Sequence, residues 1–124
     1  MRAGFEALAQ EGIEGLIRFI DPAFETTTPA GLAAEPDTYR GHDGVRRYWA
    51  SFEEIMDDIR FEPQRMTRLG DGVLVDLVVR ARGKATGIEV EQHIVQVWEL
   101  REGKAVGAET YASEADAIAA HPEA

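Results

Sequence analysis

The chain has 124 residues, of which 44% are hydrophobic and none is cysteine. This length fits a single domain, residues 1–124, with a core of its own, and the absence of cysteine excludes disulfides, thiolate catalysis and cysteine-ligated metal sites. The 23 acidic residues outnumber the 13 basic ones and give a net charge of −10, which argues against binding to nucleic-acid phosphates or anionic membranes.

Neither a targeting segment nor a membrane span is expected. Residues 1–4 lead into a helical pattern without the apolar core of a signal peptide. The longest apolar run, Ala117–Ala120, is far shorter than the roughly 20 residues that cross a bilayer. We therefore expect a cytoplasmic protein.

Two short helices are predicted near the N-terminus. The first apolar stripe ends at Gly12, and a second follows with helical spacing from Ile13 to Ile20. Asp21 precedes a proline, and that position disfavours helical backbone, so the second helix should end there. Residues 24–28 are a weak strand candidate, and the stretch 26–39, which contains proline and glycine, is expected to be a loop.

The clearest helix is predicted from about Asp43 to Asp58. Charged residues occupy one side of it. Its apolar face comprises Val45, Tyr48, Trp49, Phe52, Ile55, Met56 and Ile59.

Four strands and a short helix are predicted in the rest of the chain. Glycine-containing turns separate strand patterns at 59–69, 73–82, 88–100 and 104–111. A last helix begins at Ser113, whose spacing to Asp116 is typical of a capping box. The order of elements predicts an α+β fold with helices packed on one face of a curved antiparallel sheet.

Charge indicates the register of the two central strands. If Arg82 lies opposite Glu89 and Arg80 opposite Glu91, two favourable cross-strand pairs form on one face. The same register places Val75, Leu77 and Val79 beside Gln96, Ile94 and Gln92 on the face toward the helices.

The outer face of this sheet is predicted to be partly apolar. Its aliphatic side chains are Leu74, Val78, Val95 and Val97. A fully solvated face does not need such side chains. We therefore expect a homodimer that packs through the outer face, and the alternative is a monomer with some exposed aliphatic surface.

Two stretches of the sequence resemble a known family. The run Asp37-Thr38-Tyr39-Arg40-Gly41-His42-Asp43-Gly44-Val45-Arg46-Arg47-Tyr48-Trp49 resembles the start of the long helix in SnoaL-like proteins. Val97-Trp98-Glu99-Leu100-Arg101-Glu102-Gly103-Lys104 is similar to that family's last two strands. These proteins belong to the NTF2-like superfamily, with ketosteroid isomerases, limonene-epoxide hydrolases and polyketide cyclases. The resemblance implies a cone in which a curved sheet wraps around the N-terminal helices and one long helix and encloses an apolar cavity.

The resemblance also implies a ligand-binding site inside the cone. The residues expected to bind the ligand are Phe5, Thr28, Tyr39, Trp49, Leu77, Val79, Gln96, Trp98 and Thr110. A concave apolar site with a few polar groups is the usual form of a small-molecule pocket. The alternative for the aromatic residues is that they only fill a core.

The acid and base positions of the related enzymes carry other residue types in this chain. By similarity, these positions fall on Phe5, Thr27 or Thr28, Leu77, Val79, Gln96 and Thr110. Hydroxyl and amide groups bind and orient ligands but do not readily move protons near neutral pH. Steroid isomerisation, epoxide hydrolysis and polyketide cyclisation by the family mechanisms are therefore not expected.

We therefore expect a SnoaL-like protein that binds a small, mainly apolar molecule in the cavity, with no cofactor and no metal ion. The alternative is an enzyme of the same fold that uses His42 or Tyr39 in a non-family arrangement. A third possibility is an assembly domain whose cavity is filled by side chains. His42 has a structural alternative as part of the turn into the long helix, and His93 is expected on the outer face.

Overall fold

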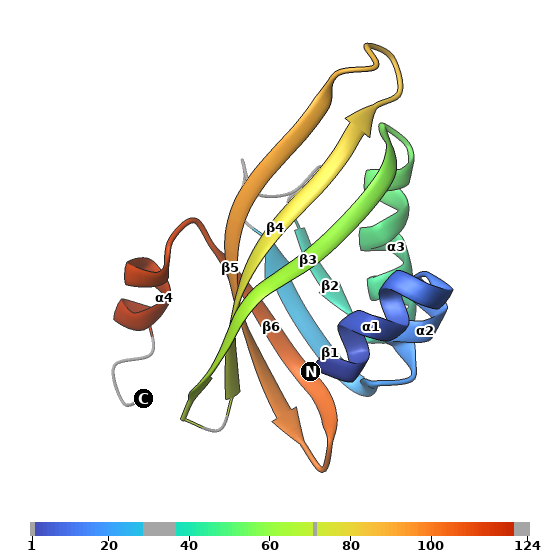
Figure 1. The fold of residues 1–124 in the computed structure, drawn as a ribbon. Helices are drawn as coiled ribbons and strands as arrows, with labels where there is room; N and C mark the ends of the chain where they lie inside the picture. Colours follow the sequence, from blue (N-terminus) through green and yellow to red (C-terminus); the bar gives the residue numbers. More distant parts are fainter. Residues whose placement is uncertain (1, 29–36, 71, 121–124) are drawn as a thin grey trace.

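The computed structural model describes residues 2–28, 37–70 and 72–120, and for residues 27, 28 and 37 it describes the backbone alone. A curved sheet wraps around three helices on one side and carries a fourth on the other (Figure 1). The predicted α+β fold is confirmed. None of the described helices is long and apolar enough to cross a membrane.

The helices are α1 (Arg2–Glu11), α2 (Ile13–Ile17), α3 (Gly41–Glu53) and α4 (Glu114–Ala120). Two of them end earlier than the apolar spacing predicts. Ile20 already begins a strand, and α3 stops at Glu53 and not near Asp58. Ile55 and Met56 fit the helical period, but the Ile55 carbonyl accepts a hydrogen bond of 3.0 Å from the backbone N–H of Lys84. Lys84 lies in a turn that is distant in the sequence, so the local spacing of apolar residues cannot predict this hydrogen bond.

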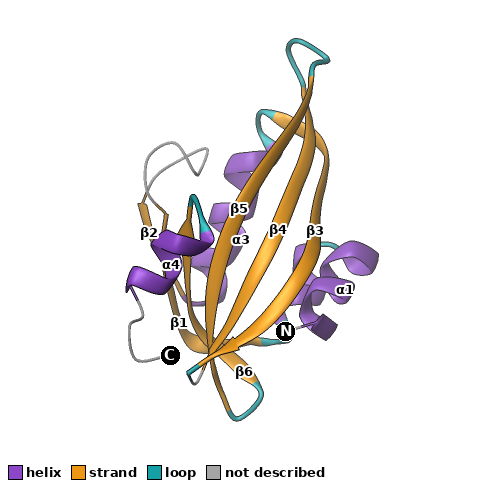
Figure 2. Ribbon diagram, turned by 60° about the vertical axis from the view of Figure 1, so that its left-hand side comes forward, coloured by secondary structure: helices purple, strands orange, loops and turns teal. Residues whose placement is uncertain are grey.

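The strands are β1 (Ile20–Thr28), β2 (Asp37–Arg40), β3 (Met56–Leu69), β4 (Gly72–Gly83), β5 (Glu89–Arg101) and β6 (Lys104–Tyr111). They form one sheet in the order β2-β1-β6-β5-β4-β3. The long strands β3, β4 and β5 bend along the molecule (Figure 2). All neighbours are antiparallel except β1 and β6, which are parallel. The sheet is therefore mixed, and the expectation of an antiparallel sheet is wrong at this one pair.

The expected loop at 26–39 is also wrong at both ends. β1 extends to Thr28, and its residues pair with β2, so that Thr26 lies opposite Tyr39. Long-range pairing with β6 on the other side of β1 holds this segment extended. The remaining part of the expected loop, residues 29–36, lies outside the described residues.

The register of β4 and β5 is the one that charge predicted. Arg80 lies opposite Glu91 and Arg82 opposite Glu89. The Arg80 guanidinium contacts Glu91 at 2.5 Å and Glu62 at 2.6 Å, and these hydrogen bonds raise the pKa of Arg80. Arg82 forms its ion pair with Asp58 on β3.

The C-terminal helix covers part of the outer face of the sheet, on the side opposite to α1–α3 (Figure 1). Ala117 of α4 is fully buried and packs with Leu74, Val95 and Val97. The fourth outer aliphatic side chain, Val78, is 4% exposed within the single chain. The side chains from which we inferred a homodimer are therefore buried without a partner, and self-association stays an untested prediction.

Replacing Ala117 with glutamate is expected to lower the free energy of unfolding by about 1–3 kcal/mol, because a polar group then enters a buried contact. Urea denaturation followed by circular dichroism measures the change. Ala115 lies exposed in the same helix, so Ala115→Glu is the matched control and should stay within about 0.5 kcal/mol of the wild type. Equal effects of the two changes would contradict the packing of α4 on the sheet.

Candidate functional site

A cavity of about 50 Å³ lies between the concave face of the sheet and α1–α3. Its lining is mostly apolar, and the polar side chains among the described lining residues are Thr26, Tyr48, Gln96 and Thr110. A buried water needs roughly 10–15 Å³ of such space, so this volume holds about three or four waters. The cone is thus largely filled by side chains but keeps a small hollow interior.

Strand alternation places three of these polar groups on the inner face. Gln96 of β5 lies opposite Thr110 of β6, and Trp98 lies opposite Ala108 in the next inward-facing row. Thr26 of β1 pairs with Ala108 in turn, and its hydroxyl donates a hydrogen bond of 2.5 Å to the Ala108 carbonyl. The polar groups therefore sit on three adjacent strands.

A chain of hydrogen bonds fixes the orientation of Gln96. The indole Nε1–H of Trp98 donates to Gln96 Oε1 at 2.9 Å, and Gln96 Nε2 donates to Thr110 Oγ1 at 3.4 Å. Gln96 is only 5% exposed. Because an indole N–H can only donate, the amide oxygen must face Trp98. The amide nitrogen, with its two hydrogens, therefore points toward Thr110, which also lines the cavity.

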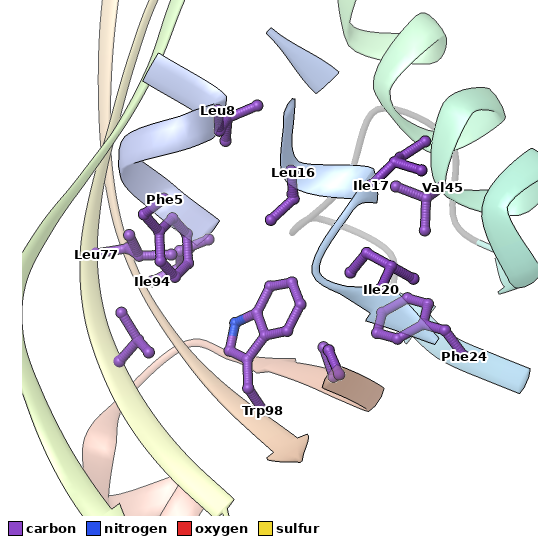
Figure 3. Close-up of a cluster of buried hydrophobic side chains, with 13 residues drawn as sticks. Phe5, Leu8, Leu16, Ile17, Ile20, Phe24, Val45, Leu77, Ile94 and Trp98 are labelled. Atoms are coloured by element: carbon purple, nitrogen blue, oxygen red, sulfur yellow. The ribbon is translucent and has the colours of Figure 1, made fainter. Parts of the chain in front are cut away.

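Aromatic packing holds Trp98 in place at the centre of the core (Figure 3). Phe5 meets its ring edge-on at 5.7 Å between ring centroids, and Phe24 stacks on it at 5.9 Å. Such pairs contribute about 0.5–1.5 kcal/mol beyond the burial of their surface. The hydrogen bond to Gln96 thus starts from a side chain that has little freedom to move.

Tyr48 of α3 also lines the cavity, and we did not predict this from the sequence. Its ring lies edge-on to Tyr39 at 5.1 Å and to Phe52 at 5.2 Å. No hydrogen bond joins its hydroxyl to a described residue. Burial raises the pKa of Tyr48, with a smaller contribution from Tyr39, so the phenol is protonated at neutral pH. The only sequence signal was a tyrosine within the apolar stripe of a helix, which is typical of core packing.

The structure brings together some of the predicted site residues and separates others. Those that line the cavity are Trp49, Gln96, Trp98 and Thr110. Phe5 and Leu77 belong to the surrounding core, and Val79 packs against that core. Tyr39 is fully buried outside the cavity lining, where the Arg47 guanidinium lies 4.2 Å from its ring centroid. The side chain of Thr28 lies outside the described residues.

His42 lies outside the cavity lining and makes a structural contact. Its Nε2 is 2.7 Å from the carbonyl oxygen of Ile20, so Nε2 carries the proton and donates it. This bond ties the start of α3 to the start of β1. His93 is on the outer face, where its Nε2 lies 3.4 Å from Glu91, and His121 lies outside the described residues.

The described lining of the cavity contains no aspartate, glutamate, histidine, lysine or arginine. Proton transfer near neutral pH needs a group whose pKa lies near the working pH. The polar groups present are hydroxyls and an amide, which orient a ligand through hydrogen bonds. No group of three metal-ligating side chains occurs among residues 2–28, 37–70 and 72–120.

A wider cleft of about 370 Å³ lies next to the cavity. Leu8 of α1 and Trp49 of α3 line both hollows and therefore form the wall between them. The charged side chains of the cleft are Glu53, Asp57, Asp58 and Lys84. A molecule that entered from this side would pass a mainly acidic rim and displace Leu8 or Trp49.

Comparisons with known proteins agree on one family and one fold. The sequence profile of the SnoaL-like domain matches residues 1–108, and no curated protein matches the sequence. An NTF2-like protein of unknown function from Burkholderia pseudomallei superposes with a TM-score of 0.79 at 23% identity, covering 97% of this chain and 92% of that one.

Two further similar structures have names that indicate a role. TerC, co-crystallised with polyporic acid, has a TM-score of 0.79 at 23% identity and covers 99% of this chain and 95% of its own. IdmH, a putative polyketide cyclase from Streptomyces antibioticus, has a TM-score of 0.72 at 22% identity, with coverage of 99% and 95%. At these identities the likeness shows the fold.

Proposed function

This chain belongs to the SnoaL-like family, with the NTF2-like fold, and on that premise we propose that its interior cavity binds a small, neutral, mainly apolar molecule. The observation that carries the proposal is the cavity itself, an apolar hollow in which the amide of Gln96 is held as a hydrogen-bond donor. Pockets for small molecules combine these two features.

The charge of the lining supports a neutral ligand. The described lining residues carry no charge that would compensate an ion, and an unpaired buried ion costs several kcal/mol. The cleft beside the cavity carries three carboxylates and one ammonium group, which disfavours the approach of organic anions.

The volume supports a ligand of modest size. The cavity of about 50 Å³ is well below the roughly 300–1,000 Å³ of pockets for drug-sized ligands. A single ring or a short chain matches it more closely. A larger molecule would require Trp49 to swing aside, which would join the cavity to the neighbouring cleft. TerC, a protein of this fold, has been co-crystallised with a small molecule, polyporic acid.

Toluene tests the proposal as a small, neutral and apolar probe. Trp49 and Trp98 both line the cavity, so titration of ¹⁵N-labelled protein should shift both indole N–H signals in a saturable way. Benzoate, which has a similar size and a negative charge, should leave them unchanged. Native mass spectrometry of the same sample would show the bound mass and the oligomeric state together.

A variant whose side chain fills the cavity tests whether toluene binds inside it. Ala108 lines the cavity and is 6% exposed, so Ala108→Leu should abolish the toluene-induced shifts while the backbone spectrum stays native. Ala115→Leu adds the same bulk on an exposed position of α4 and should change nothing. Shifts that persist in Ala108→Leu, or that benzoate produces equally, would refute binding in the cavity.

A further inference from the structure

We propose that Trp49 sets the length of the molecule that this protein binds, because its side chain separates the interior cavity from the wider cleft beside it. When the indole turns aside, the two hollows form one elongated site. This site takes a molecule with an apolar ring at one end and an uncharged polar group at the other. The inference rests on the proposed function and adds to it a ligand shape and a specificity-determining residue.

The wall between the two hollows consists of one fixed and one movable side chain. Leu8 and Trp49 line both the cavity and the cleft. Leu8 is 7% exposed and belongs to the buried core. Trp49 is only half-buried, and the cleft of about 370 Å³ lies on its open side. Trp49 is therefore the part of the wall that has space to turn into.

Packing alone holds the indole of Trp49. Its ring lies 5.5 Å from that of Phe61 on β3, measured between ring centroids, and the two planes are tilted by 57°. No hydrogen bond joins its Nε1–H to any residue that the structure describes. Trp98, in contrast, donates a hydrogen bond to Gln96 and contacts two phenylalanine rings. Turning Trp49 aside breaks one aromatic contact and no hydrogen bond.

The cleft supplies the polar end of the joined site. Among its charged side chains, Glu53, Asp57 and Lys84 form no ion pair with a described residue. The fourth, Asp58, is paired with Arg82. A hydroxyl group can donate to a carboxylate or accept from an ammonium group. The joined site is thus apolar at the cavity end and polar at the cleft end, and a molecule with a ring and a terminal hydroxyl has the same two ends.

The test compares toluene with phenylpentanol that carries its hydroxyl at the end of the chain, so that the two probes share a ring and differ in length. The indole N–H signal of Trp98 reports on the cavity. The backbone N–H signals of Gly12 and Lys84 report on the cleft, since these residues line the cleft but not the cavity. Toluene should shift the Trp98 signal alone. Phenylpentanol should shift all three signals with one dissociation constant and one molecule bound per chain.

Trp49→Ala removes the movable part of the wall. Phenylpentanol then binds without breaking the contact with Phe61, so its affinity relative to toluene should rise about two- to tenfold, the equivalent of one aromatic contact. Trp49→Phe keeps a ring in the wall and should give a smaller rise, and it serves as the test if Trp49→Ala does not fold. Phe52→Ala is the matched control, because Phe52 is also half-buried on α3 but lines neither hollow. It should keep the wild-type ratio.

The outcomes separate this inference from the proposed function. Phenylpentanol that shifts only the cavity signal, only the cleft signals, or the two sets with different dissociation constants would overturn the joined site. An affinity ratio that stays the same in the folded Trp49 variants, or that rises equally in Phe52→Ala, would overturn the role of Trp49. In each of these cases toluene binding would leave the proposed function intact. Failure of both compounds to shift the Trp98 signal would overturn the proposed function and this inference together.

Discussion

Replacing Trp98 with alanine is expected to lower the free energy of unfolding by about 3–5 kcal/mol. The side chain is 6% exposed, contacts Phe5 and Phe24 through its ring and donates to Gln96. Its removal would create a cavity and leave the Gln96 oxygen without its donor. Domains of this size have about 5–15 kcal/mol of stability in total, so the variant should be close to unfolding at 37 °C.

Urea denaturation of two related variants checks the mechanism. Trp98→Phe keeps an aromatic ring but removes the N–H, so about 1–3 kcal/mol of the loss should remain. Trp49→Ala removes an indole that is only half-buried at the cavity wall, and it should cost clearly less than Trp98→Ala. Equal losses at the two tryptophans would contradict a core centred on Trp98.

A glutamate at position 96 is expected to make stability depend on pH. Gln96→Glu keeps the size of the side chain but places a carboxyl group where only 5% of the residue is exposed and no described lining residue is cationic. Burial disfavours the charged form and raises the pKa of the carboxyl above its usual value of about 4.3. The folded variant must then either keep this carboxyl group protonated or bear the free-energy cost of a buried carboxylate.

The direction of the effect follows from proton binding. The folded state would hold this proton to a higher pH than the unfolded state, so the free energy of unfolding should fall as pH rises above about 4.3. Each tenfold difference in proton affinity corresponds to about 1.4 kcal/mol. The measurement is the difference in urea midpoint between variant and wild type at pH 5 and pH 8.

Gln64→Glu is the matched control, because Gln64 lies exposed on β3. Its midpoint difference from the wild type should stay nearly constant between the two pH values. If Gln96→Glu behaves in the same way, the environment of Gln96 is solvated and the cavity is not an apolar site.

The features that could be predicted from the sequence were those that local periodicity and charge determine. The charges of Arg80, Arg82, Glu89 and Glu91 predicted the register of β4 and β5, in which Arg80 lies opposite Glu91 and Arg82 opposite Glu89. The ion pair of Arg82 is nevertheless with Asp58. The same alternation placed Gln96, Trp98 and Thr110 on the inner face.

The features that could not be predicted depend on contacts between distant parts of the chain. The parallel pairing of β1 with β6 joins residues about 80 positions apart, and the end of α3 depends on the turn that contains Lys84. Alternation likewise indicated that the outer aliphatic side chains are buried, but it did not indicate that α4 packs on three of them, Leu74, Val95 and Val97. We attributed their burial to a second chain for this reason.

Tyr48 shows the same limit within the candidate site. Helical spacing placed it on the buried face of α3, but spacing does not show whether a hydroxyl finds a partner. Only the packed structure shows that Tyr48 lines the cavity and that no hydrogen bond joins its hydroxyl to a described residue. The hydrogen-bond partners of buried groups can therefore be identified only from the tertiary structure.

Occupancy of the interior cavity by a neutral molecule is the central claim, and a crystal soaked in bromobenzene tests it most directly. Anomalous scattering locates the bromine atom without reference to the rest of the map. We expect a single strong peak in the cavity between Trp49, Trp98 and Gln96, which disappears in crystals of Ala108→Leu. A peak confined to the outer cleft, or an empty cavity at a saturating concentration of bromobenzene, would contradict the proposed binding function.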